Sequence, residues 1–485
     1  MSETWLECLL PAILLLLLTG FLRKQFQSFL VPGVFFCTVW TAFVWIHLIF
    51  APDYEIYPGA IWWILTSVAC LILGHFTSSR IVAPVFPSRI ASDAAKTQSN
   101  PKVTGAPRFL RSTLAIAILL GTVHSLLRLR EMGRGLDSLT NLNDLATAAN
   151  QFSLERYSED SPIPPLITQC FLIPAFLAPM LGGTLFAYHN RKSDNMLSLL
   201  SLFPSLLIYA TQSTRAPVLI AVLFWICVYC AWKTFDTRGH SPKLDPKLIR
   251  YGIGLLSVMV ILVPIGDILR LGSIPTFESL LGNLREPRIR ITLFGALPAF
   301  SAWFSQAWQG ETTLAFGLYT FGGLAALLGI KDRDPGLYLG DNYLRLEGGA
   351  TNIYTFYRGL IQDFGFAGSL LFVFLAGFVG GFCHRKVVGG DRRYLGIAAA
   401  FYAFSSYFVV SLFHYNSILF AWIVFSAYVW LARPDFETFG VPDSTGQSWH
   451  GSESPQTVKT LGISGSVEGA LQYRNSPPAK NDPKS

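Results

Sequence analysis

Residues 348–382 read GGATNIYTFYRGLIQDFG followed by FAGSLLFVFLAGFVGGF, a polar and aromatic stretch that leads into an apolar run. A run of this length can cross a bilayer as a helix, so 364–382 predicts a membrane span. Ahead of it, Asn352, Arg358 and Asp363 bring polar and ionisable side chains to the edge of the span. Such side chains are costly at that depth and usually have a function. The stretch therefore predicts a membrane protein with a working site at the entry to one helix.

The rest of the chain has the same apolar character. Of its 485 residues, 51% are hydrophobic and 14% are charged, a balance that excludes an ordinary soluble domain. The formal net charge of +7 does not indicate nucleic-acid binding, because Lys and Arg lie mostly in short loops between apolar runs, where they set membrane topology. We therefore expect a lipid bilayer as partner, no nucleic acid, and an all-α polytopic membrane fold.

The apolar runs and basic loops predict about eleven transmembrane helices, with the N-terminus outside and the C-terminus inside. On this topology 78–111 is a cytoplasmic linker, while 128–164 and the longer, late loop 266–363 lie outside. The membrane domain covers 1–432, and 433–485, rich in small, polar and charged residues, is expected to be a disordered cytoplasmic tail. The predicted spans are 5–22, 29–50, 60–76, 112–127, 165–188, 197–210, 217–232, 251–265, 364–382, 395–413 and 418–431.

The segment 291–330 is apolar enough to contain one or two further spans. Its interruptions, among them Pro298, Gln306 and Gly322-Gly323, instead favour short helices that lie on the surface or re-enter the membrane. A hidden pair of spans would leave the rest of the topology unchanged, whereas a single span would invert everything after it.

Two arginine segments fall on the predicted external face. Arg215 closes the turn TQSTR (211–215), and Arg288 lies in REPRIR (285–290) of the late loop. Either arginine is interpreted as an interfacial side chain that reaches lipid headgroups. The alternative is an anion site, because the guanidinium presents a fixed fork of donors that suits phosphate oxygens.

Carboxylates surround Arg345 in the late loop: Asp332, Asp334, Asp341 and Glu347. They are interpreted as solvated surface or, in one case, as a general base for a sugar hydroxyl. The run KDRD (331–334) lacks the alternating ligand spacing of a calcium loop, so no metal site is predicted. His414, in a short outer turn, is a second candidate base because the ordinary pKa of an imidazole is near neutrality.

The opening stretch predicts a helix from Ile353, with Thr351 or Asn352 as its N-cap. With that helix, Thr351, Thr355, Arg358 and Gln362 fall on one face and form a polar stripe. The sequence DFG (363–365) then interrupts the helix before the span. Four glycines in the span are expected to allow close helix packing: Gly368, Gly377, Gly380 and Gly381.

These residues resemble a known family. NIYT (352–355), then Arg358, then DFGFAG (363–368) looks like the N-x-Y-T…D-F-G-x-x-G signature of bacterial oligosaccharide repeat-unit polymerases, the Wzy-type polymerases of O-antigen, capsule and exopolysaccharide. GLYTFGG (317–323) and STR (213–215) are also similar to that family. So is the plan of many spans, a large late external loop and a following span that ends in a basic loop.

The resemblance implies a metal-independent, cofactor-free membrane glycosyltransferase of the GT-C_B kind in the bacterial inner membrane. Such an enzyme transfers a glycan from undecaprenyl pyrophosphate to the non-reducing end of another lipid-linked repeat unit. Arg215 and Arg358 are implied as the catalytic contacts to the pyrophosphate, because each lies in a matching motif. A chain-length regulator and a flippase are candidate partners.

Further residues are assigned to substrate binding, by motif or by loop position: Arg288, Arg345, Asn352, Tyr354 and Asp363. Asp363 has an alternative role as a structural cap or ion-pair partner, because it adjoins the span. His414 and Asp341 are candidate bases by their chemistry.

Two other functions fit part of the pattern. An O-antigen ligase would use the same donor and fold with a lipid A-core acceptor, and the Asn-Tyr-Thr…Asp-Phe-Gly pattern favours the polymerase over it. A flippase or exporter of lipid-linked glycans would need charged residues along a cavity inside the spans, whose interiors are nearly free of charge.

Overall fold

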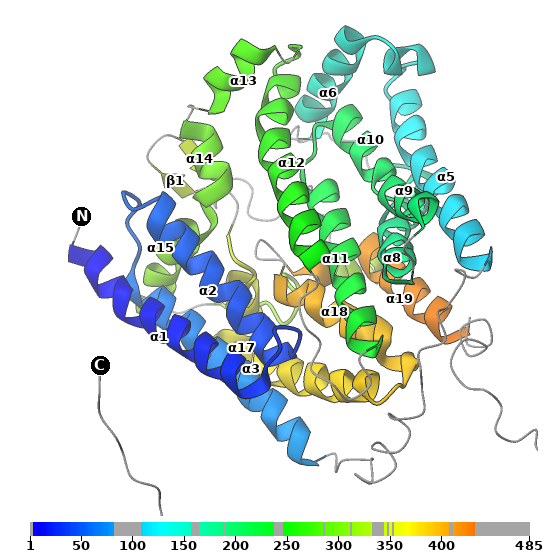
Figure 1. Cartoon of the computed structure of the whole chain (residues 1–485). Coiled ribbons are helices and arrows are strands. Elements are labelled where there is room, and N and C mark those ends of the chain that lie inside the picture. Colours follow the sequence, from blue (N-terminus) through cyan, green and yellow to red (C-terminus); the bar gives the residue numbers. More distant parts are fainter. Residues whose placement is uncertain are drawn as a thin grey trace, which may run out of the picture. The chain divides into compact units, whose positions relative to one another are not determined.

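The computed structural model describes residues 3–81, 108–156, 164–188, 191–236, 246–274, 276–284, 287–310, 313–331, 344–346, 349–351, 354–406 and 411–431. This part of the chain is helical apart from one small hairpin, in which β1 (Leu344–Leu346) pairs antiparallel with β2 (Gly349–Thr351) (Figure 1). The linker predicted between the third and fourth spans and the predicted tail lie almost entirely outside the described residues.

The long helices account for most of the predicted spans. They are α1 (Glu3–Phe26), α2 (Pro32–Phe50), α3 (Pro58–Ile81), α5 (Arg108–Glu131), α7 (Leu166–Cys170) with α8 (Leu172–Tyr188), α11 (Ala216–Asp236), α12 (Pro246–Arg270) and α17 (Phe356–Val388). In the described ranges, seven helices are long and apolar enough to cross a membrane, namely all of these except α12, with α7 and α8 taken together. The prediction of a helical membrane protein is confirmed at this level.

Shorter helices complete the described chain. They are η1 (Leu136–Leu139), α6 (Leu142–Arg156), α9 (Lys192–Leu200), α10 (Phe203–Gln212), α13 (Phe277–Leu284), α14 (Pro287–Phe294), α15 (Ala296–Gln309), α16 (Gly322–Leu327), η3 (Arg392–Tyr394), α18 (Leu395–Ser406), η4 (Leu412–His414) and α19 (Asn416–Leu431). Every predicted span contains helix, although the one at 197–210 is divided between α9 and α10. In 291–330 the helices are short, as the interruptions there predict.

Helices α3 and α17 touch at their backbones. A Cβ atom added to Gly377 would overlap the carbonyl oxygen of Leu71, and one added to Gly74 would overlap that of Phe374. Small residues at such crossings allow the close approach that holds membrane helices together. The packing predicted for Gly377, Gly380 and Gly381 is confirmed, whereas a Cβ at Gly368 would meet only its own helix.

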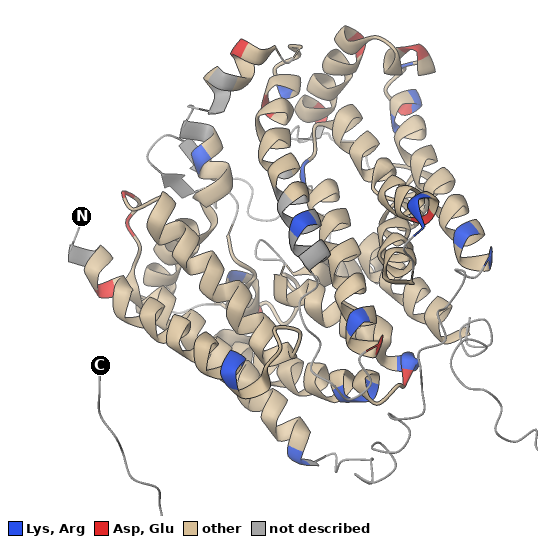
Figure 2. Cartoon of the chain, viewed as in Figure 1, with Lys and Arg blue, Asp and Glu red and all other residues tan. Residues whose placement is uncertain are grey.

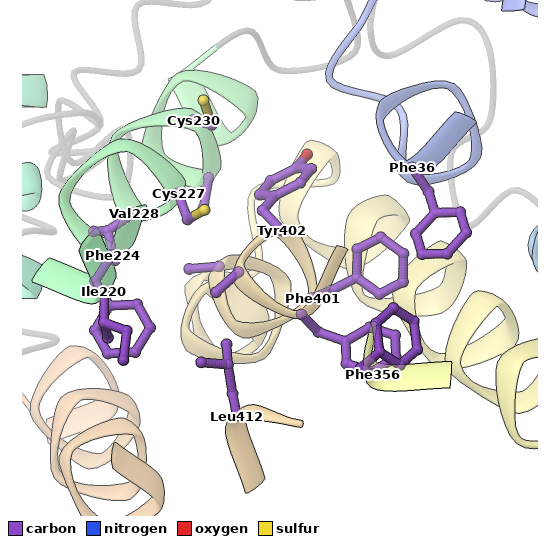
Figure 3. Close-up of a cluster of buried hydrophobic side chains, with 14 of the residues drawn as sticks. Phe36, Ile220, Phe224, Cys227, Val228, Cys230, Phe356, Phe401, Tyr402 and Leu412 are labelled. Atoms are coloured by element: carbon purple, nitrogen blue, oxygen red, sulfur yellow. The ribbon is translucent and has the colours of Figure 1, made fainter. Parts of the chain in front are cut away.

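Helix α18 lies in the middle of the apolar core. Figure 3 shows Tyr402 and Phe401 of α18 between α11, which contributes Cys227 and Cys230, and the side chains of α2 and α17. Both cysteines are buried and free, like most of the seven in the chain. Phe356 also packs here, so the first turn of α17 is anchored in the core and not in the loop before it.

The contacts at the helix ends divide the loops into two sets. In one set, Arg111 of α5 forms a bidentate ion pair with Asp194 of α9, at 2.8 and 2.9 Å. Arg385 at the end of α17 donates to the carbonyl of Ser78 in α3. All these ends are predicted to be cytoplasmic. Figure 2 shows that the charged residues fall mainly near helix ends, with long uncharged stretches such as that of α2 between them.

The second set contains ends predicted to be external. Arg290 of α14 forms an ion pair with Asp53 in the turn between α2 and α3. The amide of Tyr57 in the same turn donates to the hydroxyl of Ser301 in α15. Loops that the sequence assigns to a common side therefore contact one another in the structure.

Candidate functional site

The turn between α10 and α11 is locked onto the end of α12. Ser213, which caps α10, has a left-handed backbone with φ of 51°. Its hydroxyl donates to the carbonyl of Gly266 at 2.7 Å, and its own carbonyl accepts two bonds from the Arg270 guanidinium, at 3.1 and 3.2 Å. Both partners belong to α12. The turn that leads to Arg215 is therefore fixed against the end of α12.

Arg215 is oriented by partners from two other helices. Its guanidinium forms an ion pair with Asp267 of α12 and donates to the Thr292 hydroxyl of α14 at 3.2 Å. The side chain is only 13% exposed, and its Nε is buried without a hydrogen-bond partner among the described residues. Burial lowers the pKa of Arg215 from its ordinary value, and Asp267 acts in the opposite direction. The Arg215 guanidinium thus has a fixed orientation, and only some of its N–H donors have partners among the described residues.

The charges of this cluster do not cancel. Asp267 pairs with Arg215, while Arg270 acts on Arg215 as a second nearby positive charge, so two guanidinium groups and one carboxylate leave one net positive charge. We call Arg215, Asp267 and Arg270 the arginine cluster. Sequence reasoning missed Asp267 and Arg270, although a carboxylate and a guanidinium three positions apart directly after an apolar run were a visible signal. The cluster has the donors and the charge to bind an anion.

Arg358 lies in a second, aromatic environment. Its Cζ is 4.0 Å from the ring centroid of Tyr354 and 5.3 Å from that of Trp303 in α15, and the residue is 3% exposed. Such cation–π contacts are stronger when they are removed from water. Tyr354 is equally buried, so in this structure its ring supports Arg358. The contribution of Trp303 was not predicted, because it comes from a distant helix.

The helix that carries Arg358 begins later than the sequence indicated. Helix α17 starts at Phe356 with Thr355 as its N-cap residue, instead of at Ile353. The reason is the hairpin: Thr351, taken as a possible cap, pairs with Leu344 as the last residue of β2. The predicted interruption is confirmed, since Gly365 has φ of 68° and ψ of −178° inside α17.

Asp363 has a structural role in this conformation, which favours the cap considered for it over direct substrate binding. Its carboxylate is fully buried and accepts hydrogen bonds from the backbone amides of Tyr319 and Thr320, at 3.0 and 2.6 Å. A buried carboxylate whose two oxygens each accept a hydrogen bond from a backbone N–H already has its partners, so it does not need a ligand to satisfy it. The alternative considered for this residue, a capping role, is the one that the geometry supports.

His414 contacts the same loop from the other side. Its Nδ1 lies 3.0 Å from the carbonyl oxygen of Tyr319, and its ring packs directly on Gly322. The neighbouring Asn416 donates to the carbonyl of Gly323 at 2.7 Å. The motif GLYTFGG, the DFG break and the outer turn at His414, which are far apart in sequence, therefore meet in one place.

The segment α14–α15 contacts both arginine environments. Thr292 in α14 binds Arg215, and Trp303 in α15 packs on Arg358. Between the two helices lies Gly295, where a Cβ atom would overlap the carbonyl oxygen of Ile291. The two motif arginines are therefore connected by two short consecutive helices.

The other predicted site residues are placed as follows. Arg288 lies in α14 and Arg345 lies in β1, while Asp341 and Asn352 lie outside the described residues. Within the described ranges, no group of three His, Cys, Asp or Glu side chains is arranged to hold a metal ion.

Comparisons with protein-family models, with curated proteins and with solved structures each found no match. The resemblance of the motifs and the geometry described above are therefore the basis for a functional proposal.

Proposed function

We propose that this protein is a membrane glycosyltransferase that polymerises undecaprenyl-pyrophosphate-linked oligosaccharide repeat units on the external face of the bacterial inner membrane. The proposal combines the motif resemblance with one structural observation, the arginine cluster. A partly buried excess of positive charge at a helix turn is costly to maintain unless an anion binds to it. A lipid-linked pyrophosphate is an anion whose hydrophobic tail would keep it at that depth.

The chemistry needs positive charge where the leaving group develops negative charge. In the proposed reaction an acceptor hydroxyl oxygen attacks the anomeric carbon of the donor glycan. The bond from that carbon to the pyrophosphate oxygen breaks, and the lipid pyrophosphate departs with the electron pair. Donors already oriented toward the leaving group stabilise it without reorganisation. Arg215 fits this role because Asp267 and Thr292 fix its orientation.

Arg358 is proposed as the second contact to the pyrophosphate. The rings of Tyr354 and Trp303 hold its guanidinium, which keeps the fork in a defined plane. A lysine ammonium is a point charge on a flexible stem and cannot reproduce such a fork. Activity is thus expected to require arginine, and not lysine, at the positions of both Arg215 and Arg358.

The finer topology belongs to the same proposal. It has about eleven spans, a periplasmic N-terminus and a cytoplasmic C-terminus, following the positive-inside tendency. It is supported by the contacts of Arg290 with Asp53 and of Arg111 with Asp194, each of which joins loops assigned to one side. On this topology the arginine cluster and Arg358 both face the periplasmic side.

The test is chain extension in cells that lack the gene and carry a variant. Arg215→Ala and Arg358→Ala are expected to reduce polymer ladders by at least about a hundredfold, as for loss of a leaving-group donor. Lysine at either position is expected to restore little of the loss. Arg393→Ala is the matched control, since the Arg393 side chain is 58% exposed and, among the described residues, forms its ion pair with Asp391 on the opposite set of loops. All variants are first compared for protein level in the membrane.

The pattern of the glycan separates the candidate functions. Caps of a single repeat unit in the deletion strain support the polymerase. Accumulation of lipid-linked polymer would instead assign the protein to the ligase class. Ladders of normal length in both alanine variants would refute the role of the arginines.

A further inference from the structure

The loop 315–323 connects Asp363 to His414. On one side it is bound to the α17 break: the amides of Ala315 and Phe316 donate to the carbonyls of Gln362 and Asp363, at 2.9 and 3.1 Å. The turn is tight, with positive φ at Phe316 (48°) and Gly317 (96°). Because the loop is bound so closely, a shift of Asp363 is expected to shift His414 as well.

Tyr319 is the residue that both partners bind. Its amide donates to Asp363 Oδ1 at 3.0 Å, and its carbonyl oxygen lies 3.0 Å from Nδ1 of His414. A carbonyl oxygen can only accept a hydrogen bond, so Nδ1 must carry the proton. In the neutral imidazole the basic lone pair is then on Nε2. The backbone of Tyr319 therefore selects the tautomer of His414.

We propose that Asp363 is a positioning residue that fixes the Tyr319 peptide and thereby holds His414 with Nε2 as its proton-accepting atom. This inference rests on the proposed polymerase function. In the reaction, Nε2 of His414 accepts the proton of the acceptor hydroxyl while the oxygen attacks the anomeric carbon, and the lipid pyrophosphate leaves with the electron pair. The imidazolium formed keeps its Nδ1–H bond to Tyr319.

Few charged groups surround His414 in the described chain. The helices packed against its turn, α16 and α19, carry no charged side chain. The groups that do face it are the Tyr415 ring, at 5.4 Å between ring centroids, and Asp363 through the Tyr319 peptide. Lys331 lies further along, with Nζ 5.5 Å from the Tyr319 ring. Asp363 is thus connected to the imidazole through the backbone of Tyr319.

A second variant disturbs the contact between the loop and His414 and leaves Asp363 unchanged. A Cβ atom at Gly322 would lie on Cε1 and Nδ1 of His414, so Gly322→Ala displaces the ring directly. Asn416→Ala is the matched control, because it removes one hydrogen bond to the same loop, at Gly323, without touching Tyr319. Together with Asp363→Asn, these variants separate loss of the coupling from general loosening of the loop.

The first measurement is nitrogen NMR of the full-length protein with labelled histidine, in lipid nanodiscs. The signal of His414 among the eight histidines is identified by its disappearance in His414→Gln. Wild type and Asn416→Ala are expected to show the Nδ1–H tautomer. Asp363→Asn and Gly322→Ala are expected to show a mixture of the two tautomers. This readout does not depend on enzyme activity.

The second measurement is the pH dependence of chain extension by purified protein. In Asp363→Asn and Gly322→Ala the maximal rate is expected to fall by about tenfold to a hundredfold, as for a misplaced base. In Asp363→Asn the acid limb should also move to lower pH, because a neighbouring carboxylate favours the imidazolium. Effects of the two variants should not add, since they act on one contact.

The outcomes are distinct. An unchanged tautomer in both Asp363→Asn and Gly322→Ala overturns the coupling, whatever the enzyme does. A changed tautomer with an unmoved acid limb overturns its catalytic use. Wild-type protein that extends no chain on lipid-linked repeat units refutes the polymerase itself, and with it the catalytic part of this inference.

Discussion

Replacing Asp267 with Asn removes the one carboxylate of the arginine cluster while keeping a side-chain oxygen that can accept from Arg215. If the cluster binds pyrophosphate, Asp267 competes with it for the same guanidinium. The substitution removes one negative charge, so the net charge of the cluster rises from +1 to +2. We therefore expect Asp267→Asn to bind inorganic pyrophosphate more tightly than the wild type.

The size of the effect follows from how far the pair is from water. The side chains of Arg215 and Asp267 are 13% and 22% exposed, so an effective dielectric constant of about 20 applies. A phosphate charge about 7 Å from the carboxylate is then repelled by about 2 kcal/mol. Partial exposure to water and salt reduces this to about 1 to 1.5 kcal/mol, or a roughly tenfold change in Kd.

Titration calorimetry of the purified protein with pyrophosphate measures this directly. Asp53→Asn is the matched control: it removes the same charge from an ion pair with Arg290, in which the two side chains are 39% and 45% exposed. It is expected to leave the affinity unchanged. Affinity that is equal or weaker in Asp267→Asn, with unchanged thermal stability, would show that the cluster only stabilises the fold.

Other predictions concern the fold and its orientation. Gly377→Leu is expected to prevent accumulation of folded protein, because no space exists between α17 and α3; gel filtration in detergent measures it. Gly365→Ala should destabilise the protein by about 1 to 3 kcal/mol, since its φ and ψ are nearly exclusive to glycine, and thermal unfolding measures it. In a Cys170→Ser background, an impermeant thiol reagent added to intact cells should label Asp53→Cys and not Arg393→Cys. The reverse labelling would invert the topology.

Much of the helical architecture was predictable because it depends on local patterns in the sequence. Apolar runs specify where helices form, and a glycine after Asp363 specifies where α17 breaks, since Gly365 adopts a backbone that other residues avoid. The close contact at Gly377 was also expected from a small residue in an apolar helix. Each of these features depends on neighbours in sequence or on the bilayer.

The details of the site were less predictable because they depend on distant partners. Thr351 was a reasonable cap by composition, but pairing with Leu344 makes it part of a strand. Asp363 looked like a site residue until the amides of Tyr319 and Thr320 were found on its oxygens. Pairings over such separations leave no periodic signal in a single sequence, so they follow only from the three-dimensional arrangement.

Helices α14 and α15 contact both of the arginines that we propose as one site. Helix α15 has 14 residues and therefore spans about 21 Å, too short to cross a hydrocarbon core of about 30 Å. It must then rest on neighbouring helices, and its contacts through Trp303 place it on Arg358. Because α14 also binds Arg215 through Thr292, this one segment touches both of the arginines proposed to contact the pyrophosphate.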